Sequence, residues 1–353
     1  MKDLLIRADA TRQAGMGHVM RCLALAQAWR NQGGRALFLG HCEGEQLQSR
    51  ISSDGFDIIP LKQRHPDPVD LKTTIGILHK LNAGTTKRDT WLVADGYHFD
   101  DAYQKGIKDA GYSLLLIDDY GQSGHCCSDI ILNQNILADS SFYPNRNPET
   151  QLLLGPSYTL IRGEFKPWRK APRQIPDVAH KILVTMGGGD PDNLTLKVLQ
   201  ALQELTLPNI EVKVVIGHTN PNKHLFQEEC VNAVHHMQIL FSMKDMPELM
   251  AWSDLAIIQA GGTLWELLFM GCAVISYATT MFQEEILKTL DRMHIVKYLG
   301  YVDQMVPTSL LSSIHDLSSS KEHREEVRRL GMDIVDGQGA ERVLDHMRQR
   351  TIP

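Results

Sequence analysis

The feature of this sequence that most constrains its fold is a repeated alternation between short apolar runs and longer stretches with helical periodicity. Such runs, separated by amphipathic helices, predict parallel strands that are buried on both faces of a sheet. Each strand, helix and following strand then forms a right-handed crossover, so the pattern predicts an α/β fold. In the first half of the chain, the predicted strands are Leu4–Ile6, Ala36–Leu39, Asp57–Leu61, Trp91–Ala94, Leu114–Ile117 and Ile130–Leu132, and the predicted helices are His18–Asn31, Leu71–Leu81 and Asp100–Ala110.

The alternation stops once, in the segment Lys166–His180. Pro167, Pro172 and Pro176 lie there among Lys and Arg residues, and proline continues neither a helix nor a central strand. This composition predicts a linker. The alternation then starts again with predicted strands at Ile182–Thr185, Val212–Ile216, Met237–Leu240, Leu255–Ile258 and Ala273–Ser276.

The length of the chain agrees with two domains, because 353 residues exceed one ordinary core and suit two domains of roughly 150–180 residues each. We predict two Rossmann-like, doubly wound domains. Residues 1–165 form the N-terminal domain, 166–180 the linker and 181–336 the C-terminal domain. The last segment, 337–353, contains a helix with one polar side, Gly339–Arg348, and its return to the first domain is left open.

The composition argues against nucleic-acid and integral membrane partners. The net charge is −6 without a long run of Lys or Arg, so the charge that nucleic-acid binding needs is missing. No stretch reaches the roughly 18–20 apolar residues of a spanning helix, and the chain begins directly with the strand-like Leu4–Ile6. The six cysteines contain no Cys-x-x-Cys pair, which favours a reducing compartment. We expect a cytoplasmic protein that is a monomer or a weak homodimer.

The loop between the first predicted strand and the first predicted helix is a candidate catalytic site. Ligands of open parallel sheets bind outside the carboxyl ends of the strands, and Gly15 and Gly17 allow close approach to the backbone there. His18 follows at a helix N-terminus, where the helix dipole and lost solvation favour a neutral imidazole that accepts a proton. Asp9, at the end of the strand, is near enough in sequence to orient this imidazole. The alternative is a tight turn that His18 merely caps.

This loop does not match the fingerprint of a nicotinamide dinucleotide site. The fingerprint requires G-x-G-x-x-G, but the position of the third glycine is Met20. The second strand also ends at Phe38-Leu39-Gly40, without the acidic residue that binds the ribose. No cofactor is therefore expected.

A glycine-rich loop also follows the first strand of the second half. Gly187, Gly188 and Gly189 follow Ile182–Thr185 after Met186 and leave bare backbone for a ligand. The next residues, Asp190-Pro191-Asp192, contain the D-x-D pattern of some metal-dependent transferases. Aspartate at a helix start is explained by capping alone, so no metal is expected.

A third loop, Gln259–Thr263, lies between the strand Leu255–Ile258 and a predicted helix at Leu264–Met270. The backbone N–H groups of Gly261 and Gly262 and the Thr263 hydroxyl form a site for a diphosphate. Glu266, one turn into the helix, can accept two hydrogen bonds from ribose hydroxyls.

Short motifs run through nearly the whole chain, from the first strand to Asp336-Gly-Gln-Gly-Ala-Glu-Arg342. The others are Gly15-Met-Gly-His18-Val-Met-Arg21, Asp95-Gly-Tyr97, Leu154-Gly-Pro-Ser-Tyr158, Arg162-Gly-Glu-Phe165, Gly187-Gly-Gly-Asp190 and Gly261-Gly-Thr-Leu-Trp-Glu266. In this order and spacing they resemble the UDP-2,4-diacetamido-2,4,6-trideoxy-β-L-altropyranose hydrolase family of pseudaminic acid biosynthesis. The related spore-coat polysaccharide proteins share them.

The resemblance implies the GT-B fold, in which two Rossmann-like domains face a central cleft. It implies that UDP lies on the C-terminal domain, with Glu266 on the ribose and the 261–263 helix start on the diphosphate. The sugar then faces the N-terminal domain. The implied reaction is inverting hydrolysis of the anomeric C–O bond without a metal, with His18 as the base on the attacking water.

The resemblance also suggests supporting residues. Tyr97 matches an active-site tyrosine, and the alternative for it is an aromatic wall for the sugar. Asp9 and Arg21 belong to the same signature as His18. Arg162 and the glycines Gly187 to Gly189 complete the predicted substrate site.

One position departs from the family pattern. The family carries Asn-Gln after the late strand, whereas this chain reads Thr279-Thr280-Met281-Phe282-Gln283. Gln283 remains, but Phe282 offers no hydrogen bond, and a buried polar group of the usual sugar would lose about 1–3 kcal/mol. Three alternatives therefore stay open beside hydrolysis of the usual sugar: a different sugar, a glycosyltransferase acting on another acceptor, or a non-catalytic nucleotide-sugar binder.

Overall fold

The chain forms two compact units. The first unit comprises Met1–Gly163 together with Gly337–Pro353, and the second comprises Glu164–Asp336, so the C-terminal segment belongs to the first unit. The computed structural model describes residues 3–11, 15–82, 89–121, 124–169, 173–187, 190, 193–217, 220, 222–231, 233–241 and 246–351.

The described part of the predicted linker, residues 166–169 and 173–180, belongs to the second unit. It begins with a short helix, α5 (Lys166–Arg169). Arg169 donates hydrogen bonds to the main-chain carbonyls of Met332 and Val335, both at 2.7 Å. Such carbonyls at the end of a helix lack intrahelical partners and attract a cation. Arg169, one of the basic residues of the predicted linker, thus attaches this segment to the second unit.

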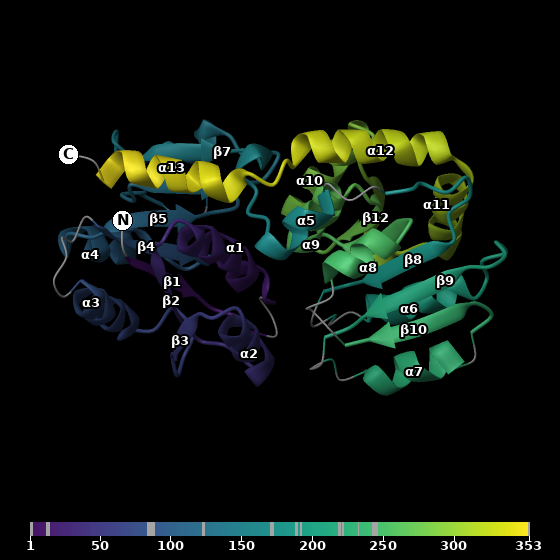
Figure 1. Ribbon diagram of the computed structural model, residues 1–353, viewed down its shortest axis with the longest axis horizontal. Coiled ribbons are helices and arrows are strands. Elements are labelled where there is room, and N and C mark those ends of the chain that lie inside the picture. The colour runs from purple at the N-terminus through teal and green to yellow at the C-terminus, as the bar shows by residue number, and fades with distance from the viewer. Residues whose placement is uncertain are drawn as a thin grey trace. The chain divides into compact units, whose positions relative to one another are not determined.

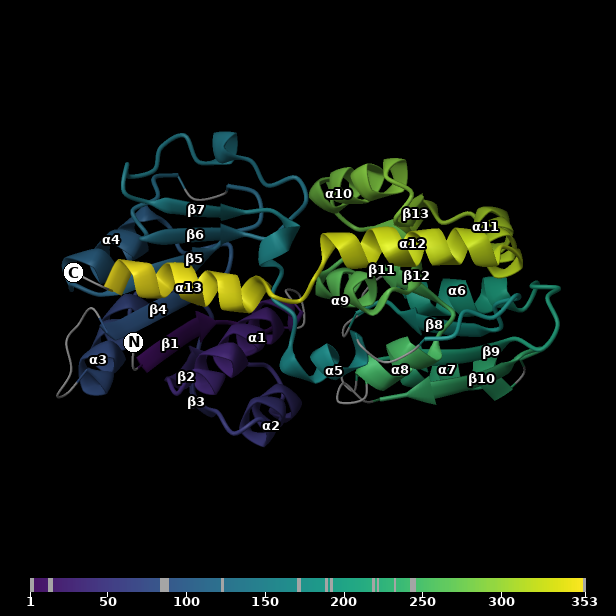
Figure 2. The ribbon, with the colours of Figure 1, turned by 45° about the horizontal axis from the view of Figure 1, so that its top comes forward.

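The first unit contains one parallel sheet of seven strands in the order β3-β2-β1-β4-β5-β6-β7. Figure 2 shows the strands in this order, with α1 and α13 in front of them. The six strands predicted for this part of the chain are confirmed. The seventh, β7, was not predicted because the described residues before it hold only a short 3-10 helix, η2 (Ser140–Phe142). The strands are β1 (Asp3–Ala8), β2 (Arg35–Gly40), β3 (Asp57–Pro60), β4 (Thr90–Asp95), β5 (Ser113–Ile117), β6 (Ile130–Asn133) and β7 (Gln151–Leu154).

Alternate side chains of these strands pack on opposite faces of the sheet. Leu4 of β1 and Trp91 and Val93 of β4 form a core with α1, α2 and α13, whereas Leu5 and Leu92 pack with α3 and α4. This period of two follows from the pleat, and burial on both faces explains why the strands read as continuous apolar runs. Figure 1 shows α13, in yellow, beside α1. The helices are α1 (Gly17–Asn31), α2 (Glu45–Ser53), α3 (Asp70–Leu81), α4 (Asp101–Asp109) and α13 (Gly339–Thr351).

The second unit repeats the architecture with a parallel sheet of six strands in the order β10-β9-β8-β11-β12-β13. Five of these strands were predicted, and β13 was not. No helix in the described part of the chain has both the length and the apolar character that crossing a membrane requires. The strands are β8 (Lys181–Thr185), β9 (Glu211–Val215), β10 (His236–Leu240), β11 (Leu255–Gln259), β12 (Ala273–Ala278) and β13 (Lys297–Tyr301). The helices after α5 are α6 (Leu194–Leu202), α7 (Lys223–Val231), α8 (Met246–Trp252), α9 (Gly262–Met270), α10 (Met281–Arg292), α11 (Pro307–Ser319) and α12 (Lys321–Ile334).

In each sheet the direction of winding reverses beside the strand that comes first in the chain. The reversal lies between β1 and β4 in the first unit and between β8 and β11 in the second. Open parallel sheets bind ligands outside the carboxyl ends of the strands at this point. The loops after these four strands are therefore the places to examine, and they contain the predicted site motifs.

Candidate active site

His18 hydrogen-bonds to a buried carboxylate of the first unit. Its Nδ1 lies 2.6 Å from Oδ1 of Asp95, and the side chains of His18 and Asp95 are 10% and 0% exposed. Burial alone would raise the pKa of the Asp95 carboxyl, but the charges of Arg21 and His18 and their hydrogen bonds hold it well below its usual range. Because Asp95 is an anion, the shared proton belongs to Nδ1, which leaves the lone pair of the ring on Nε2. Among the described residues, none hydrogen-bonds to Nε2.

The alternation of side chains along a strand explains why Asp95 reaches the imidazole. Asp95 ends β4 and points in the same direction as Trp91 and Val93, which pack on the face covered by α1. His18 lies at the start of α1 on that same face. The Asp-His pair therefore follows from the register of β4 beneath α1.

Asp9 points to the opposite face, in the direction of Leu5. Its carboxylate accepts hydrogen bonds from Arg7 and from the backbone N–H groups of His41 and His65, the latter two at 2.7 and 2.8 Å. The expectation that Asp9 orients His18 is therefore not met. Asp9 instead ties the loops after β2 and β3 to the end of β1.

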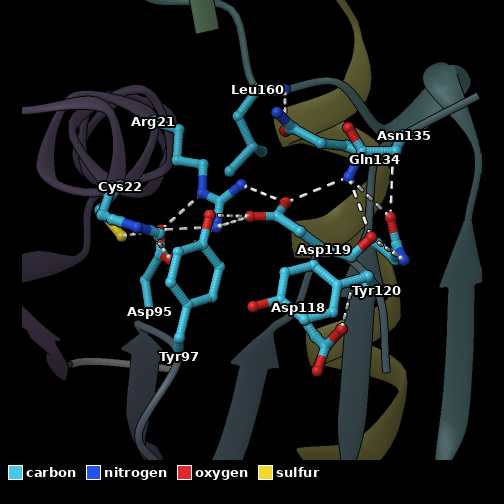
Figure 3. Close-up of polar contacts among 12 residues, drawn as sticks. Arg21, Cys22, Asp95, Tyr97, Asp118, Asp119, Tyr120, Gln134, Asn135 and Leu160 are labelled. Carbon is cyan, nitrogen blue, oxygen red and sulfur yellow. Dashed lines mark hydrogen bonds and ion pairs between the residues drawn. The ribbon is translucent and has the colours of Figure 1, made fainter. Parts of the chain in front are cut away.

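Arg21 bridges two carboxylates, as Figure 3 shows. Its Nε and Nη2 donate to Asp95 at 2.6 Å each, and its Nη1 and Nη2 donate to Asp119 at 2.7 and 3.2 Å. Residues three and four apart share a helix face, so His18, Arg21 and Cys22 meet Asp95 together. Arg21 was predicted to bind substrate; the structure shows that its guanidinium pairs with these two carboxylates and holds them in place.

Tyr97 lies beside the imidazole. Its ring is edge-on to His18, with centroids 4.9 Å apart and an angle of 81° between the planes, and its hydroxyl donates to Asp119 at 3.1 Å. Desolvation and the negative charge of Asp119 raise the pKa of the Tyr97 hydroxyl, so it acts as a donor and not as a base. The side chain is 44% exposed, which suits the predicted aromatic wall.

The side chains around His18 carry one positive and two negative charges. One positive charge, on Arg21, lies between the negative charges of Asp95 and Asp119. Burial acts to raise the pKa of Asp119, but the charge and hydrogen bonds of Arg21 hold it below its usual value. The cluster of Arg21, Asp95 and Asp119 therefore has a net negative charge beside the imidazole. This arrangement can act as a general base toward water or a hydroxyl group.

The start of α1 is open to a ligand. Gly15 has φ +71°, a conformation that favours glycine, and a Cβ added to Gly15 or Gly17 would meet no atom within 4 Å. Met16, at the N-cap, provides no side-chain cap, and the first turn has no acidic residue. Arg12, Gln13 and Ala14 lie outside the described residues.

The loop after β8 is described only in part. Gly187 has φ +77° and open space at its Cα, whereas Gly188 and Gly189 lie outside the described residues. The carboxylate of Asp190, 3% exposed, accepts hydrogen bonds from the N–H groups of Leu194 and Thr195 at 2.8 and 3.0 Å. Asp190 thus caps the start of α6, as expected from the sequence.

The loop after β11 presents the free start of α9. Gly261 is the N-cap residue and Gly262 the first residue of the helix, with no side-chain cap and no acidic residue in the first turn. A Cβ on either glycine would meet no atom within 4 Å. Thr263 and Glu266 follow and are half-buried. A helix start with these properties suits a bound anion.

Gln283 connects the two loops at the ends of β11 and β12. Its Oε1 accepts hydrogen bonds from the backbone N–H and the hydroxyl of Thr279, both at 2.8 Å, and its Nε2 donates to the carbonyl of Ala260 at 3.1 Å. Ala260 directly precedes Gly261. Gln283 was predicted to bind substrate, and its amide holds the glycine loop in place; Phe282, its neighbour at the start of α10, is half-buried.

Replacing Gln283 with alanine should weaken the UDP binding that the sequence resemblance implies by about tenfold, because the hydrogen bonds that order the glycine loop contribute about 1 kcal/mol or more. Isothermal titration calorimetry with UDP measures this change. Gln200→Ala is a matched control, since Gln200 lies on the exposed side of α6. Equal UDP affinity in the wild type and in Gln283→Ala would contradict the role of this amide.

Arg162 lies near the end of the first unit and is 4% exposed. The sequence predicted a substrate contact for it. The structure buries this side chain in the first unit, so Arg162 could contact a ligand only at a site inside that unit.

Sequence reasoning assigned no role to Asp95 or Asp119. Asp95 stood in a quoted motif, and one signal could have found it: it ends a buried strand with the side-chain direction of Trp91 and Val93. Asp119 gave no such signal, because its partner Arg21 lies 98 residues away. Only the sheet order, which places β5 next to β4, brings the two together.

Comparison with known proteins agrees with this architecture. Residues 181–328 match the glycosyltransferase family 28 C-terminal domain. The chain is 27% identical to the UDP-2,4-diacetamido-2,4,6-trideoxy-beta-L-altropyranose hydrolase of Campylobacter jejuni, over 76% of this chain and 88% of that protein. It is 24% identical to the spore coat polysaccharide biosynthesis protein SpsG of Bacillus subtilis, over 96% of this chain and 95% of that protein.

Two further comparisons add an archaeal relative and a solved structure. The uncharacterized protein MJ1062 of Methanocaldococcus jannaschii is 26% identical over 83% of this chain, which spans 60% of that protein's length. The crystal structure of MurG from Acinetobacter baumannii matches with a TM-score of 0.66 at 16% identity, covering 99% of this chain and 100% of MurG. The chain therefore has the GT-B fold, with a second unit that matches the glycosyltransferase family 28 C-terminal domain, and it is a relative of the altropyranose hydrolase and SpsG.

Proposed function

We propose that this protein hydrolyses a UDP-activated diacetamido-trideoxy sugar at the anomeric carbon and releases UDP, as a step of nonulosonic (pseudaminic) acid biosynthesis. The observation that carries the proposal is the 2.6 Å hydrogen bond from Nδ1 of His18 to Asp95, which directs a basic Nε2 away from its carboxylate. The name of the Campylobacter jejuni relative supports the choice of sugar.

In the proposed reaction, Nε2 of His18 removes a proton from water as the water oxygen attacks the anomeric carbon. The bond from that carbon to the diphosphate oxygen breaks, and its electron pair leaves with UDP, so the configuration inverts. Asp95 keeps the imidazole in the required tautomer, and Asp95 and Asp119 stabilise the imidazolium. A diphosphate is a good leaving group, so positioning and charge stabilisation suffice and no metal is needed.

UDP is proposed to bind on the second unit. The start of α9 at Gly261 and Gly262, with the Thr263 hydroxyl, receives the diphosphate, and Glu266 accepts hydrogen bonds from the ribose. The open space at both glycines and the lack of a cap on α9 support this assignment. The Gly187 loop, at the corresponding place after β8, is proposed to complete the substrate site.

A glycosyltransferase is the second candidate, because the match to the family 28 domain covers most of the second unit. In that reaction a hydroxyl group of an acceptor takes the place of water, and His18 plays the same part. The structure of the His18 site suits both reactions. The two reactions differ in whether water or an acceptor hydroxyl attacks the anomeric carbon.

Incubation with a panel of UDP- and CMP-activated amino sugars, with and without candidate acceptors, tests the proposal. Mass spectrometry should detect UDP and free sugar in equal amounts without any acceptor. Release of UDP only in the presence of an acceptor would identify a transferase. Tight binding without any UDP release would identify a non-catalytic binder.

Replacing Asp95 with asparagine should lower kcat by roughly 10²–10⁴-fold, because the imidazole loses the charge that orients it and stabilises its protonated form. The KM for the UDP-sugar should change little, since Asp95 is buried beneath His18. Steady-state measurement of UDP release gives both constants. A variant that retains wild-type kcat would show that the Asp-His pair plays no part in the chemical step.

A further inference from the structure

Two of the few exposed aromatic side chains of this protein are neighbours. Among the described Phe, Tyr and Trp residues, only Tyr97, Tyr120 and Trp168 are exposed, at 44, 42 and 37%. The rings of Tyr97 and Tyr120 lie 5.4 Å apart between centroids with a tilt of 36°, and Figure 3 shows them next to each other beside Asp119. Grouped exposed apolar surface is typical of a binding site.

A buried carboxylate holds the backbone of Tyr120 in place. Asp118, which is 0% exposed, accepts hydrogen bonds from the N–H groups of Tyr120 and Gly121 at 2.8 and 2.6 Å and from the hydroxyl of Tyr143 at 3.1 Å. The carbonyl of Asp119 accepts a further hydrogen bond from Asn133 at 2.9 Å. The backbone on both sides of the Tyr120 peptide is thereby anchored to the interior of the first unit.

Gly121 restricts this loop further. It has φ +74°, and an added Cβ would lie 2.4 Å from the carbonyl oxygen of Phe142, so no other residue fits there. These contacts hold the backbone of residues 118–121, while the Tyr120 ring lies at the surface. A ring carried on an anchored backbone loses less freedom on contact with a ligand than a ring on a mobile loop.

The aromatic pair is also connected to the proposed base. Tyr97 contacts the imidazole of His18 edge-on at 4.9 Å and donates to Asp119, which directly precedes Tyr120. The imidazole and the two rings thus form a continuous row. A molecule whose reacting atom lies at His18 has the rings of Tyr97 and Tyr120 within reach.

We infer that Tyr120 is a specificity-determining residue that packs, together with Tyr97, against an apolar face of the substrate sugar. This inference rests on the proposed function. The two rings are already in contact, so the sugar lies across both and not between them. An aromatic face packs well against C–H and methyl groups, whereas a hydroxyl group buried against it loses its hydrogen bonds to water. The two rings therefore favour a sugar with acetamido or C-methyl substituents over a fully hydroxylated one.

The test uses the full-length protein and the UDP-amino sugar of the panel above that gives the fastest UDP release. Replacing Tyr120 with alanine should raise KM for this sugar by about tenfold, the loss expected for one aromatic contact, and leave kcat and the affinity for UDP alone unchanged. Tyr120→Phe, which keeps the ring, should retain wild-type KM. Thermal unfolding of each variant shows whether it is folded.

The outcomes separate this inference from the proposed function. Turnover by the wild type with equal KM in the wild type and Tyr120→Ala would overturn the role of Tyr120 and leave the proposed reaction standing. A rise in KM for Tyr120→Phe as large as for Tyr120→Ala would overturn the role of the ring. No UDP release by the wild type from any sugar, with or without an acceptor, would overturn the proposed function and this inference with it.

Discussion

Replacing His18 with asparagine should lower UDP release from the nucleotide-sugar by roughly 10²–10⁴-fold, the contribution of a positioned general base. Asparagine has no nitrogen that takes up a proton near neutral pH. The affinity for UDP should persist, because the proposed nucleotide site lies on α9 of the second unit. Steady-state kinetics and calorimetry with UDP measure the two effects separately.

His79→Asn is a matched control for this variant. His79 also belongs to the first unit, and its Nδ1 hydrogen-bonds to the hydroxyl of Tyr112 at 2.8 Å. It is not one of the three neighbouring rings of His18, Tyr97 and Tyr120. It should turn over substrate at the wild-type rate. If His18→Asn kept near-wild-type activity, the assignment of the base would be lost, whatever the control showed.

Replacing Asp70 with asparagine should destabilise the first unit by about 3 kcal/mol, the lower end of the cost of removing one partner from a buried ion pair. Arg7 is 0% exposed, and its Nε and Nη2 donate to Asp70 at distances down to 2.7 Å. His65 and Thr74 also hydrogen-bond to this carboxylate. The lower end applies because Asp9 remains beside Arg7. The midpoint of urea unfolding measures the loss.

Asp109→Asn controls for the change of charge alone. Asp109 pairs with Lys105 at 2.6 Å on the surface of α4, where both side chains are largely exposed. Such pairs contribute little in water, so this variant should unfold close to the wild type. Equal midpoints for Asp70→Asn and Asp109→Asn would show that the buried network does not stabilise the first unit.

The lowered pKa of Asp70 predicts how the stability of the first unit changes in acid. Burial would raise the pKa of Asp70, but hydrogen bonds from His65 and Arg7 and the charge of Arg7 hold it well below its usual range. The pKa in the folded state is thus lower than the unfolded value of about 3.9. Its contribution to stability is present above that pH and lost as the pH falls below it. Unfolding measured from neutral pH down to about pH 3 should therefore show a shallower decline in Asp70→Asn than in the wild type.

His18 and Asp70 belong to two charged clusters on opposite faces of the same sheet. On the α1 face, Asp95 and Asp119 surround Arg21 and leave an excess negative charge beside His18. On the α3 face, Asp9 and Asp70 surround Arg7 and hold the loops that follow β2 and β3. Both clusters lie at the carboxyl ends of the strands. The first has an imidazole and exposed aromatic rings beside it, whereas the second is enclosed and serves stability.

The strands were predictable because their signal is local. A strand buried on both faces needs a short apolar run, and each predicted run coincides with a strand of the structure. β7 and β13 were missed because each lacks one part of this signal. No α-helix lies between β6 and Gln151–Leu154 in the described chain, and Lys297–Tyr301 begins with lysine and contains Gly300. Neither strand therefore combines an apolar run with a preceding helix, as the alternation requires.

The sequence by itself determined the two-sheet α/β fold and the glycine-rich loops, and it placed His18 at the start of a helix. Only the tertiary structure decided which carboxylate serves the imidazole, because Asp95 lies 77 residues from His18 and Asp9 lies nine positions before it. Strand parity sends Asp9 to the α3 face, and the sheet order places β4 beside β1 beneath α1. Partners chosen by sheet order and strand direction are not encoded in nearby residues, so sequence proximity selected the wrong neighbour.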